Sequence, residues 1–238
     1  MFRPKATNKR DLATASERFA LYVEGPRDRD VLRLFAKKLS PELAAAMDPC
    51  VRILGGRQPA RAAKLFEQLL SDAADAANKN AAAPTGLCVL DRDDPQHEHP
   101  DPNKALGTGG ENDGEGQPKS RALEFVVWRR RQIESYLMVP SAIRRCVTKQ
   151  SAGRADHQML DQVLARSLPD PDNEEAFRKL DAKRVLGARG PIASLLGRPL
   201  RAQEIVRNMT PLDVHPDVKE VLARVRDHIG NTQLGTPS

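Results

Sequence analysis

The chain of 238 residues contains few cysteines and few aromatic residues. Its three cysteines, Cys50, Cys88 and Cys146, are odd in number and far apart, and this spacing argues against a disulfide framework or a zinc cluster. We therefore expect buried thiols. Aromatic residues make up 4% of the chain, a fraction too small for a main binding mode in which nucleic-acid bases stack on exposed rings.

Long apolar runs are absent as well. No window approaches the roughly 18 consecutive apolar residues that a membrane helix requires, and residues 1–18 lack the apolar stretch of a secretory signal. These absences predict a cytoplasmic protein with no membrane partner. The 38 Lys and Arg residues outnumber the 32 Asp and Glu residues, and the net charge of +6 permits a polyanionic partner without requiring one.

Short apolar runs alternate with helix-like patterns in the first part of the chain. Apolar residues recur at helical spacing in 26–39 and 59–78, and each of these segments follows an apolar run. This alternation implies right-handed crossovers and a parallel sheet covered on both faces. We therefore predict an α/β fold, with a mostly parallel four-stranded sheet flanked by helices and a C-terminal helical extension. The predicted strands are 18–24, 50–54, 86–91 and 122–128.

Composition divides the chain into three parts. We expect a flexible N-terminus at 1–17, an α/β domain at 18–140 and a helical region at 141–238. Within the α/β domain, residues 92–119 are rich in Asp, Pro, His and Gly, which predicts a disordered insertion. Further helices are expected at 132–139, ending at Pro140, and near 155–167, 173–186, 203–208 and 216–229.

Acidic residues follow two of the predicted strands. Glu24 ends the first strand, and Asp28 lies four residues later in the first turn of the next helix. Asp91 ends the third strand, and Asp93 follows two residues on, so that both can project to the same side. Ligands bind beyond the carboxyl ends of parallel strands, and clustered carboxylates repel one another unless a cation neutralises them. Oxygen ligands of this kind favour Mg²⁺ or Mn²⁺.

The segments around these carboxylates resemble a known domain. EGPRD at 24–28 and LDRDD at 90–94 are similar to the two acidic motifs of the TOPRIM domain, which occurs in topoisomerases, bacterial primases and certain nucleases. RRQIESYL at 130–137, followed by Pro140, resembles the segment after the fourth strand in TOPRIM domains of the OLD (overcoming lysogenization defect) nuclease class, with Ser135 where that class usually carries Asn. The resemblance implies a TOPRIM or Rossmann-like sheet.

The helical part of the chain extends the resemblance. AKRVL at 182–186 is similar to a segment of the OLD class that contains a lysine thought to act in catalysis, so the similarity covers about 19–186. It implies an Mg²⁺-dependent endonuclease that hydrolyses phosphodiester bonds of DNA, or less readily of RNA, with one or two bound metal ions. The implied metal ligands are Glu24, Asp28, Asp91, Asp93 and Glu134, and the implied catalytic residues are Glu24, Asp91, Asp93 and Lys183.

Basic residues lie close to the same motifs. By the resemblance they would bind backbone phosphates, although a solvated basic face is an equally good interpretation. Glu24 could alternatively act as a general base. The residues predicted to bind nucleic acid are Arg27, Arg92, Arg129, Arg130 and Arg131.

Several alternatives stay open at this point. OLD enzymes often carry an ABC-type ATPase, but the sequence has no Gly-x-x-x-x-Gly-Lys-Ser/Thr motif, so a separate ATPase partner would have to supply nucleotide hydrolysis. The resemblance suggests an effector of an anti-phage defence system, and the main alternative is a non-catalytic or partner-gated TOPRIM module.

The apolar stripe at Val218, Val221, Leu222 and Val225 either forms a homodimer contact or packs on the sheet. Topoisomerase activity is disfavoured, because Tyr22 and Tyr136 both fall in predicted core elements.

Overall fold

A computed structural model describes residues 18–75, 83–92, 122–150 and 157–234. The predicted flexible N-terminus and all but the first residue of the predicted insertion lie outside these ranges. Among the described residues, no helix has both the length and the apolar character needed to cross a membrane.

Four strands form one parallel sheet, in the order β2-β1-β3-β4. This order places β1 and β3 at the centre, so that each of them has a neighbouring strand on both sides. The predicted α/β fold is confirmed, and every pairing is parallel. The strands are β1 (Phe19–Val23), β2 (Val51–Ile53), β3 (Thr85–Leu90) and β4 (Leu123–Val127).

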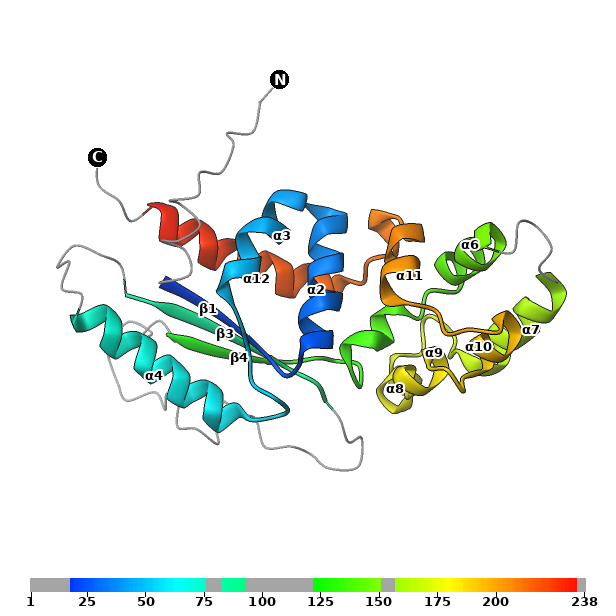
Figure 1. Ribbon diagram of the computed structural model, residues 1–238, viewed down its shortest axis with the longest axis horizontal. Coiled ribbons are helices and arrows are strands. Elements are labelled where there is room, and N and C mark those ends of the chain that lie inside the picture. Colours follow the sequence, from blue (N-terminus) through cyan, green and yellow to red (C-terminus); the bar gives the residue numbers. More distant parts are fainter. Residues whose placement is uncertain (1–17, 76–82, 93–121, 151–156, 235–238) are drawn as a thin grey trace, which may run out of the picture.

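Helices cover both faces of this sheet (Figure 1). On one face, alternate residues of β1 such as Leu21 pack with α2 (Pro26–Leu39) and α3 (Pro41–Met47). On the other face, Tyr22 packs against α4 (Pro59–Asp75). This alternation follows from the two-residue period of a strand, and it explains why the central strands are apolar throughout.

Local sequence explains where the first helices begin. Pro26 starts α2, because a missing N–H costs nothing in the first turn. The carboxylate of Asp28 accepts a hydrogen bond from Gly25 N at 2.7 Å, which satisfies a donor at this helix end. The hydroxyl of Ser40 caps α3 by accepting from Leu43 N at 3.2 Å. This second helix was not expected from the sequence, and a short 3₁₀ helix, η1 (Asp48–Cys50), connects it to β2.

The last helix returns to the sheet. In α12 (Pro216–Leu234), the apolar stripe that includes Val218, Leu222 and Val225 is buried in the core formed with β1 and α2. Packing on the sheet therefore accounts for this stripe. The α/β layers include the C-terminal helix, although the sequence division at residue 140 placed that helix in the separate helical region.

The remaining elements form the helical region beside the sheet (Figure 1). The helix expected to end at Pro140 is instead a short 3₁₀ helix, and Pro140 begins the next α-helix, where proline is well tolerated. The single helix expected at 173–186 is two helices, because Asp181 caps a new one by accepting from Arg184 N. The 3₁₀ helix η2 (Ile133–Leu137) follows β4 and belongs to the α/β side. The helical region contains α6 (Pro140–Gln150), α7 (His157–Ser167), α8 (Glu174–Lys179), α9 (Ala182–Leu186), α10 (Pro191–Leu196), α11 (Ala202–Asn208) and η3 (Pro211–Asp213).

The cysteines and tyrosines lie in the core, as predicted. All three cysteines are free and buried, and burial raises the pKa of Cys50 to about 11 and that of Cys88 to about 12. Tyr22 in β1 and Tyr136 in η2 are each 1% exposed. Neither hydroxyl is placed to attack a DNA backbone from the surface.

Candidate metal centre

Three acidic side chains from separate parts of the chain converge at the carboxyl end of the sheet. Asp28 lies in the first turn of α2, Asp91 directly follows β3, and Glu134 lies in η2. Each offers one carboxylate oxygen, and these oxygens all lie within 4.8 Å of one another. We call these three residues the acidic trio. Asp91 is 4% exposed and Glu134 is 0% exposed, so solvent screens their charges poorly.

Parallel pairing explains this convergence. β3 lies between β1 and β4, so the segments that leave all three strands begin at the same edge of the sheet. Backbone amides then orient two of the carboxylates. Gly25 N donates to Asp28 Oδ2, and Ile133 N donates to Asp91 Oδ1 at 3.1 Å. The second bond ties the end of β3 to η2, the element that carries Glu134.

Burial favours the neutral form of these acids. It is the main cause that raises the pKa of Asp91 to about 7, and the negative charges of Asp28, Glu24 and Glu134 add to it, whereas Lys183 opposes it. Burial likewise raises the pKa of Asp28 and that of Glu134. A carboxyl that titrates near neutrality inside a cluster of acids is typical of a functional site.

Several oxygens of the trio are buried without a hydrogen bond. Both side-chain oxygens of Glu134 and Oδ1 of Asp28 accept none from the residues that the structure describes. Most buried polar atoms in folded proteins do have such a partner, so this group of oxygens is unusual. Buried oxygens that are close together and form no hydrogen bond fit a hard divalent cation such as Mg²⁺ or Mn²⁺.

Two basic side chains partly offset the charge of the trio. Lys183 Nζ lies 3.4 Å from Asp91 Oδ2 and 3.7 Å from Glu134 Oε2. Arg27 Nε lies 2.8 Å from Glu134 Oε1, in an ion pair that lacks hydrogen-bond geometry. Partial burial disfavours the charged lysine, but Glu134, Asp91 and Asp28 outweigh this effect and raise the pKa of Lys183. Lys183 is therefore held as a cation beside the trio.

Glu24 lies beside the trio and is not a member of it. Its Oε1 accepts a hydrogen bond from Asp91 N at 2.8 Å and lies 4.0 Å from Arg57 Nη1. Arg57 also donates to the backbone carbonyl of Asp91. In this arrangement Glu24 and Arg57 hold the backbone at Asp91 from both sides. Asp93, the other predicted ligand, lies outside the described residues.

Sequence reasoning missed Arg57. The available signal was the pair Gly55 and Gly56, whose φ angles of 82° and 130° lie in the region that favours glycine. Both glycine amides donate to the carbonyl of Glu24 at 2.9 Å, which turns the chain back toward the first strand. Arg57 follows this turn directly, so the turn carries its side chain to the end of β3.

Three of the predicted phosphate-binding arginines lie near the trio. The side chain of Arg27 is 57% exposed, although its Nε contacts the buried Glu134. Arg92 is half-buried, and its Nε donates to the carbonyl of Trp128 at 3.3 Å. Arg131 is also half-buried, and its carbonyl accepts from Arg92 N at 2.9 Å. Of these three, Arg27 is the most exposed and therefore the best placed to meet a phosphate.

The other two arginines have different surroundings. Arg129 is exposed, and it lies 3.3 Å from Asp217 Oδ1 at the start of α12. Arg130 is buried, with 7% of its side chain exposed, and its guanidinium contacts Glu174 of α8. The prediction that Arg130 binds a backbone phosphate does not fit this burial, because its guanidinium is committed to the protein interior.

Comparisons with known proteins give no relative for this chain. No family model matches it, and neither the curated proteins nor the solved structures contain a match. Function must therefore be inferred from the trio and its surroundings, and the TOPRIM resemblance stays a prediction from the motifs.

Proposed function

We propose that the protein is a metal-dependent nuclease that hydrolyses phosphodiester bonds, with DNA as the preferred substrate and RNA as the second. One observation carries this proposal. Lys183, which is 92 positions from Asp91 in the sequence, lies with its amine against Asp91 and Glu134, two of the three carboxylates that converge at the carboxyl end of a parallel sheet. Acids that bind a cation next to a lysine that neutralises phosphate are the groups that phosphodiester hydrolysis needs.

The trio would hold Mg²⁺ or Mn²⁺ through Asp28, Asp91 and Glu134, because several of their clustered oxygens form no hydrogen bond. When bound, the cation would supply activation of water and neutralisation of phosphate charge. Lys183 would offset the negative charge that develops on the phosphate during hydrolysis. Glu24 accepts from the amide of Asp91, so its role in this proposal is to hold Asp91 in place.

The surrounding charges also support a polyanionic substrate. The side chain of Arg27 is 57% exposed and its Nε contacts Glu134, so its guanidinium could also bind a phosphate. Arg57 and Arg92 add further positive charge at the same edge of the sheet. The motifs that resemble TOPRIM domains of the OLD class support the same assignment, and with it a role as a defence effector that acts with a separate ATPase.

A second candidate function is a binding module without turnover. It is favoured by the way in which Lys183 and Arg27 already offset charge within the trio. In such a module, these side chains would act as permanent counter-charges, and a partner would supply any enzymatic activity. The two candidates differ in whether a divalent cation enters the trio.

The first test is cleavage by the purified chain. Supercoiled plasmid and a structured RNA are incubated with wild type and with Asp91→Ala, in Mg²⁺, in Mn²⁺ and in EDTA. We expect nicking of plasmid in either metal, none in EDTA, and a loss of about a thousandfold or more in Asp91→Ala, because the site loses a ligand worth several kcal/mol in the transition state.

The matched control is Asp161→Ala, which removes a different aspartate that also pairs with a basic residue, Arg144 of α6. Asp161 is about half exposed and lies on α7, so this variant should cleave at the wild-type rate. Cleavage by Asp91→Ala at the wild-type rate would contradict the proposal. Absence of both Mn²⁺ binding and cleavage would favour the binding module, in which Lys183 and Arg27 take the place of the cation.

A further inference from the structure

A buried arginine connects the two segments that meet at the trio. Arg130 follows β4, and its Nη1 donates to the carbonyl of Ser135 at 3.1 Å. Ser135 is the neighbour of Glu134 in η2, so this bond fixes the turn that carries a member of the trio. Ser135 is itself buried, and the contact lies in the protein interior. A charged donor in such a place forms a stronger bond than a neutral one.

The other side of the same guanidinium contacts the helical region. Arg130 Nε donates to Glu174 Oε2 at 3.1 Å, at the first residue of α8. The ring of Phe177, one turn further along α8, lies 3.7 Å from the Arg130 guanidinium carbon. The helix α8 leads directly into α9, the five-residue helix that carries Lys183. Arg130 thus touches the element of Glu134 and the element that precedes Lys183.

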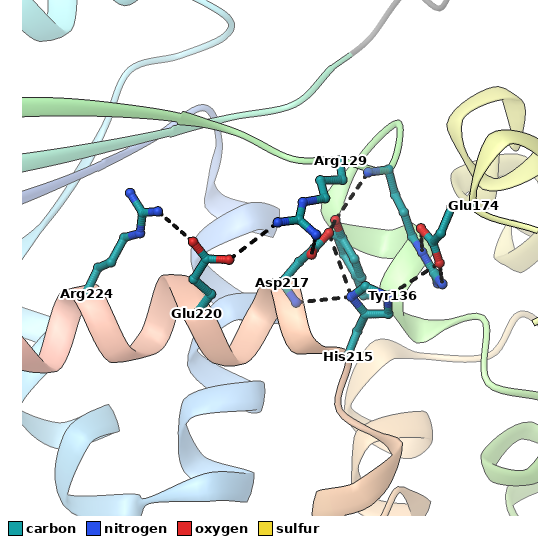
Figure 2. Close-up of polar contacts among 8 residues, drawn as sticks. Arg129, Tyr136, Glu174, His215, Asp217, Glu220 and Arg224 are labelled. Carbon is teal, nitrogen blue, oxygen red and sulfur yellow. Dashed lines mark hydrogen bonds and ion pairs between the residues drawn. The ribbon is translucent and has the colours of Figure 1, made fainter. Parts of the chain in front are cut away.

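Further polar groups surround this contact (Figure 2). The hydroxyl of Tyr136 accepts from Arg130 N at 3.2 Å and donates to Asp217 Oδ2 at 2.8 Å. His215 Nδ1 accepts from Asp217 N at 3.1 Å, and its Nε2 lies 3.4 Å from Glu174 Oε1. With Nδ1 as an acceptor, the neutral imidazole carries its proton on Nε2, where it can donate to Glu174. Each charged side chain of the network therefore has a polar partner.

The position of Lys183 depends on this support. Its side chain is 42% exposed, and α9 has too few residues to be stable by itself. Its ion pairs with Asp91 and Glu134 are partly exposed, and pairs of that kind contribute little. The contacts at α8 are the larger constraint, because Arg130 is itself buried and joins η2 to α8 through several groups at once. It donates to the carbonyl of Ser135 and to Glu174, and it lies over the ring of Phe177.

We infer that Arg130 and Glu174 are positioning residues that hold Lys183 against the acidic trio. The inference rests on the proposed function for the role of Lys183, whereas the placement itself can be measured without metal or nucleic acid. Within the described part of the chain, the side chains of Arg130 and Glu174 contact other residues than the three members of the trio. They act through the connection from η2 to α8 and α9.

The test is the rate at which Lys183 is acylated in the full-length, metal-free protein, measured by mass spectrometry in wild type and in Glu174→Gln. Lys64, an exposed residue of α4, serves as the reference in the same sample. We expect acylation of Lys183 to be roughly two- to fivefold faster in Glu174→Gln, the range that corresponds to loss of one partly exposed ion pair. The rate at Lys64 should not change.

Glu204→Gln is the matched control, because Glu204 also pairs with an arginine, Arg198, in the helical region. It should leave the acylation rate of Lys183 at the wild-type value. An unchanged rate at Lys183 in Glu174→Gln would overturn the inference. If Glu174→Gln fails to fold, Arg130→Lys provides the same test. A lysine keeps the positive charge but cannot bond Glu174 and the carbonyl of Ser135 at the same time with the geometry of a guanidinium.

Cleavage assays separate this inference from the proposed function. If the protein cleaves but acylation of Lys183 is unchanged in Glu174→Gln, positioning by Glu174 is wrong and the nuclease assignment stands. If acylation rises but no protein cleaves, the positioning is correct and the nuclease assignment is wrong. If both hold, Glu174→Gln should slow cleavage in the wild-type background and have no further effect in Lys183→Met.

Discussion

The α/β sheet and the helical region contribute opposite charges to the same site. The sheet side brings three carboxylates together, at the start of α2, after β3 and in η2. The helical region contributes Lys183 from α9, and its α8 holds a buried guanidinium through Glu174. Each side needs the opposite charge of the other. The clustered acids repel one another, and partial burial disfavours the charged lysine. The site therefore forms only where the two regions pack together.

Removal of the Lys183 ammonium group from the helical side should slow cleavage strongly, although by no more than Asp91→Ala does. We expect Lys183→Met to slow metal-dependent cleavage by about 10²- to 10³-fold, because charge on the phosphate loses a preorganised partner. Binding of Mn²⁺ should become tighter at the same time, since the amine no longer competes for Asp91 and Glu134. Initial cleavage rates and Mn²⁺ titration by electron paramagnetic resonance measure the two effects.

Lys179→Met is the control for this variant. Lys179 is an exposed lysine of α8 that pairs with Glu175 on the surface, so its removal should change neither quantity. Wild-type cleavage by Lys183→Met would show that the lysine is only a counter-charge. Weaker Mn²⁺ binding in that variant would show that Lys183 supports the metal centre in place of competing with it.

A more modest effect should appear on the sheet side, in the pH dependence of stability. The pKa of Asp91, raised to about 7, lies above its value in the unfolded chain, so folding favours the neutral carboxyl. The stability that this adds is fully present below about pH 4 and is lost as pH rises through about 7. We therefore expect the Tm of the metal-free protein to fall over this window by roughly 10 °C through this group.

The difference between wild type and Asp91→Asn isolates this contribution. His215 and His228 act in the opposite direction, because burial lowers the pKa of each and their stability is lost as pH falls. Both proteins contain these histidines, so their effect cancels. Equal pH profiles in calorimetry would show that Asp91 is ionised throughout. Addition of Mg²⁺ at pH 8 should raise the Tm of wild type and leave Asp91→Asn nearly unchanged.

The sequence predicted the sheet side of the site better than the helical side. Strand ends are visible as apolar runs that stop at an acid, so the sequence pattern alone was enough to place Asp28 and Asp91 at one edge of the sheet. Glu134 and Lys183 lie on short elements whose positions depend on tertiary packing, and only the family resemblance suggested them. Local pattern does not specify how a five-residue helix docks.

The run of three arginines shows why the burial of individual side chains could not be predicted from the sequence. Arg129, Arg130 and Arg131 are identical neighbours in sequence, yet the first is exposed, the second is buried and the third is half-buried. Arg130 is buried because the ring of Phe177 and the carboxylate of Glu174, both on α8, surround its guanidinium. The sequence near Arg130 contains no pattern that predicts these contacts. The sequence around Pro140 was misleading because a proline can either end one helix or begin the next. We expected a helix to end there, whereas Pro140 begins α6.

The smallest effects are expected when either of two exposed arginines is replaced by alanine. These arginines pair with acids on different elements. Arg27 pairs with Glu134 of the trio at 2.8 Å, whereas Arg129 pairs with Asp217 of α12 at 3.3 Å. Arg27→Ala should weaken DNA binding a few-fold and reduce the slope of its salt dependence by about one, as expected when one phosphate contact is lost. Arg129→Ala should change folding stability by less than about 1 kcal/mol and leave DNA binding unchanged.

Fluorescence anisotropy in EDTA, at several salt concentrations, measures both variants without cleavage. Similar exposure makes Arg129→Ala a matched control, with 67% of the Arg129 side chain exposed against 57% for Arg27. If both variants lose the same affinity, the DNA path continues from the trio across the start of α12, and the acidic residues there must be displaced by phosphate. If only Arg27→Ala loses affinity, the substrate enters between α2 and Lys183, and the helical region contacts it through α9.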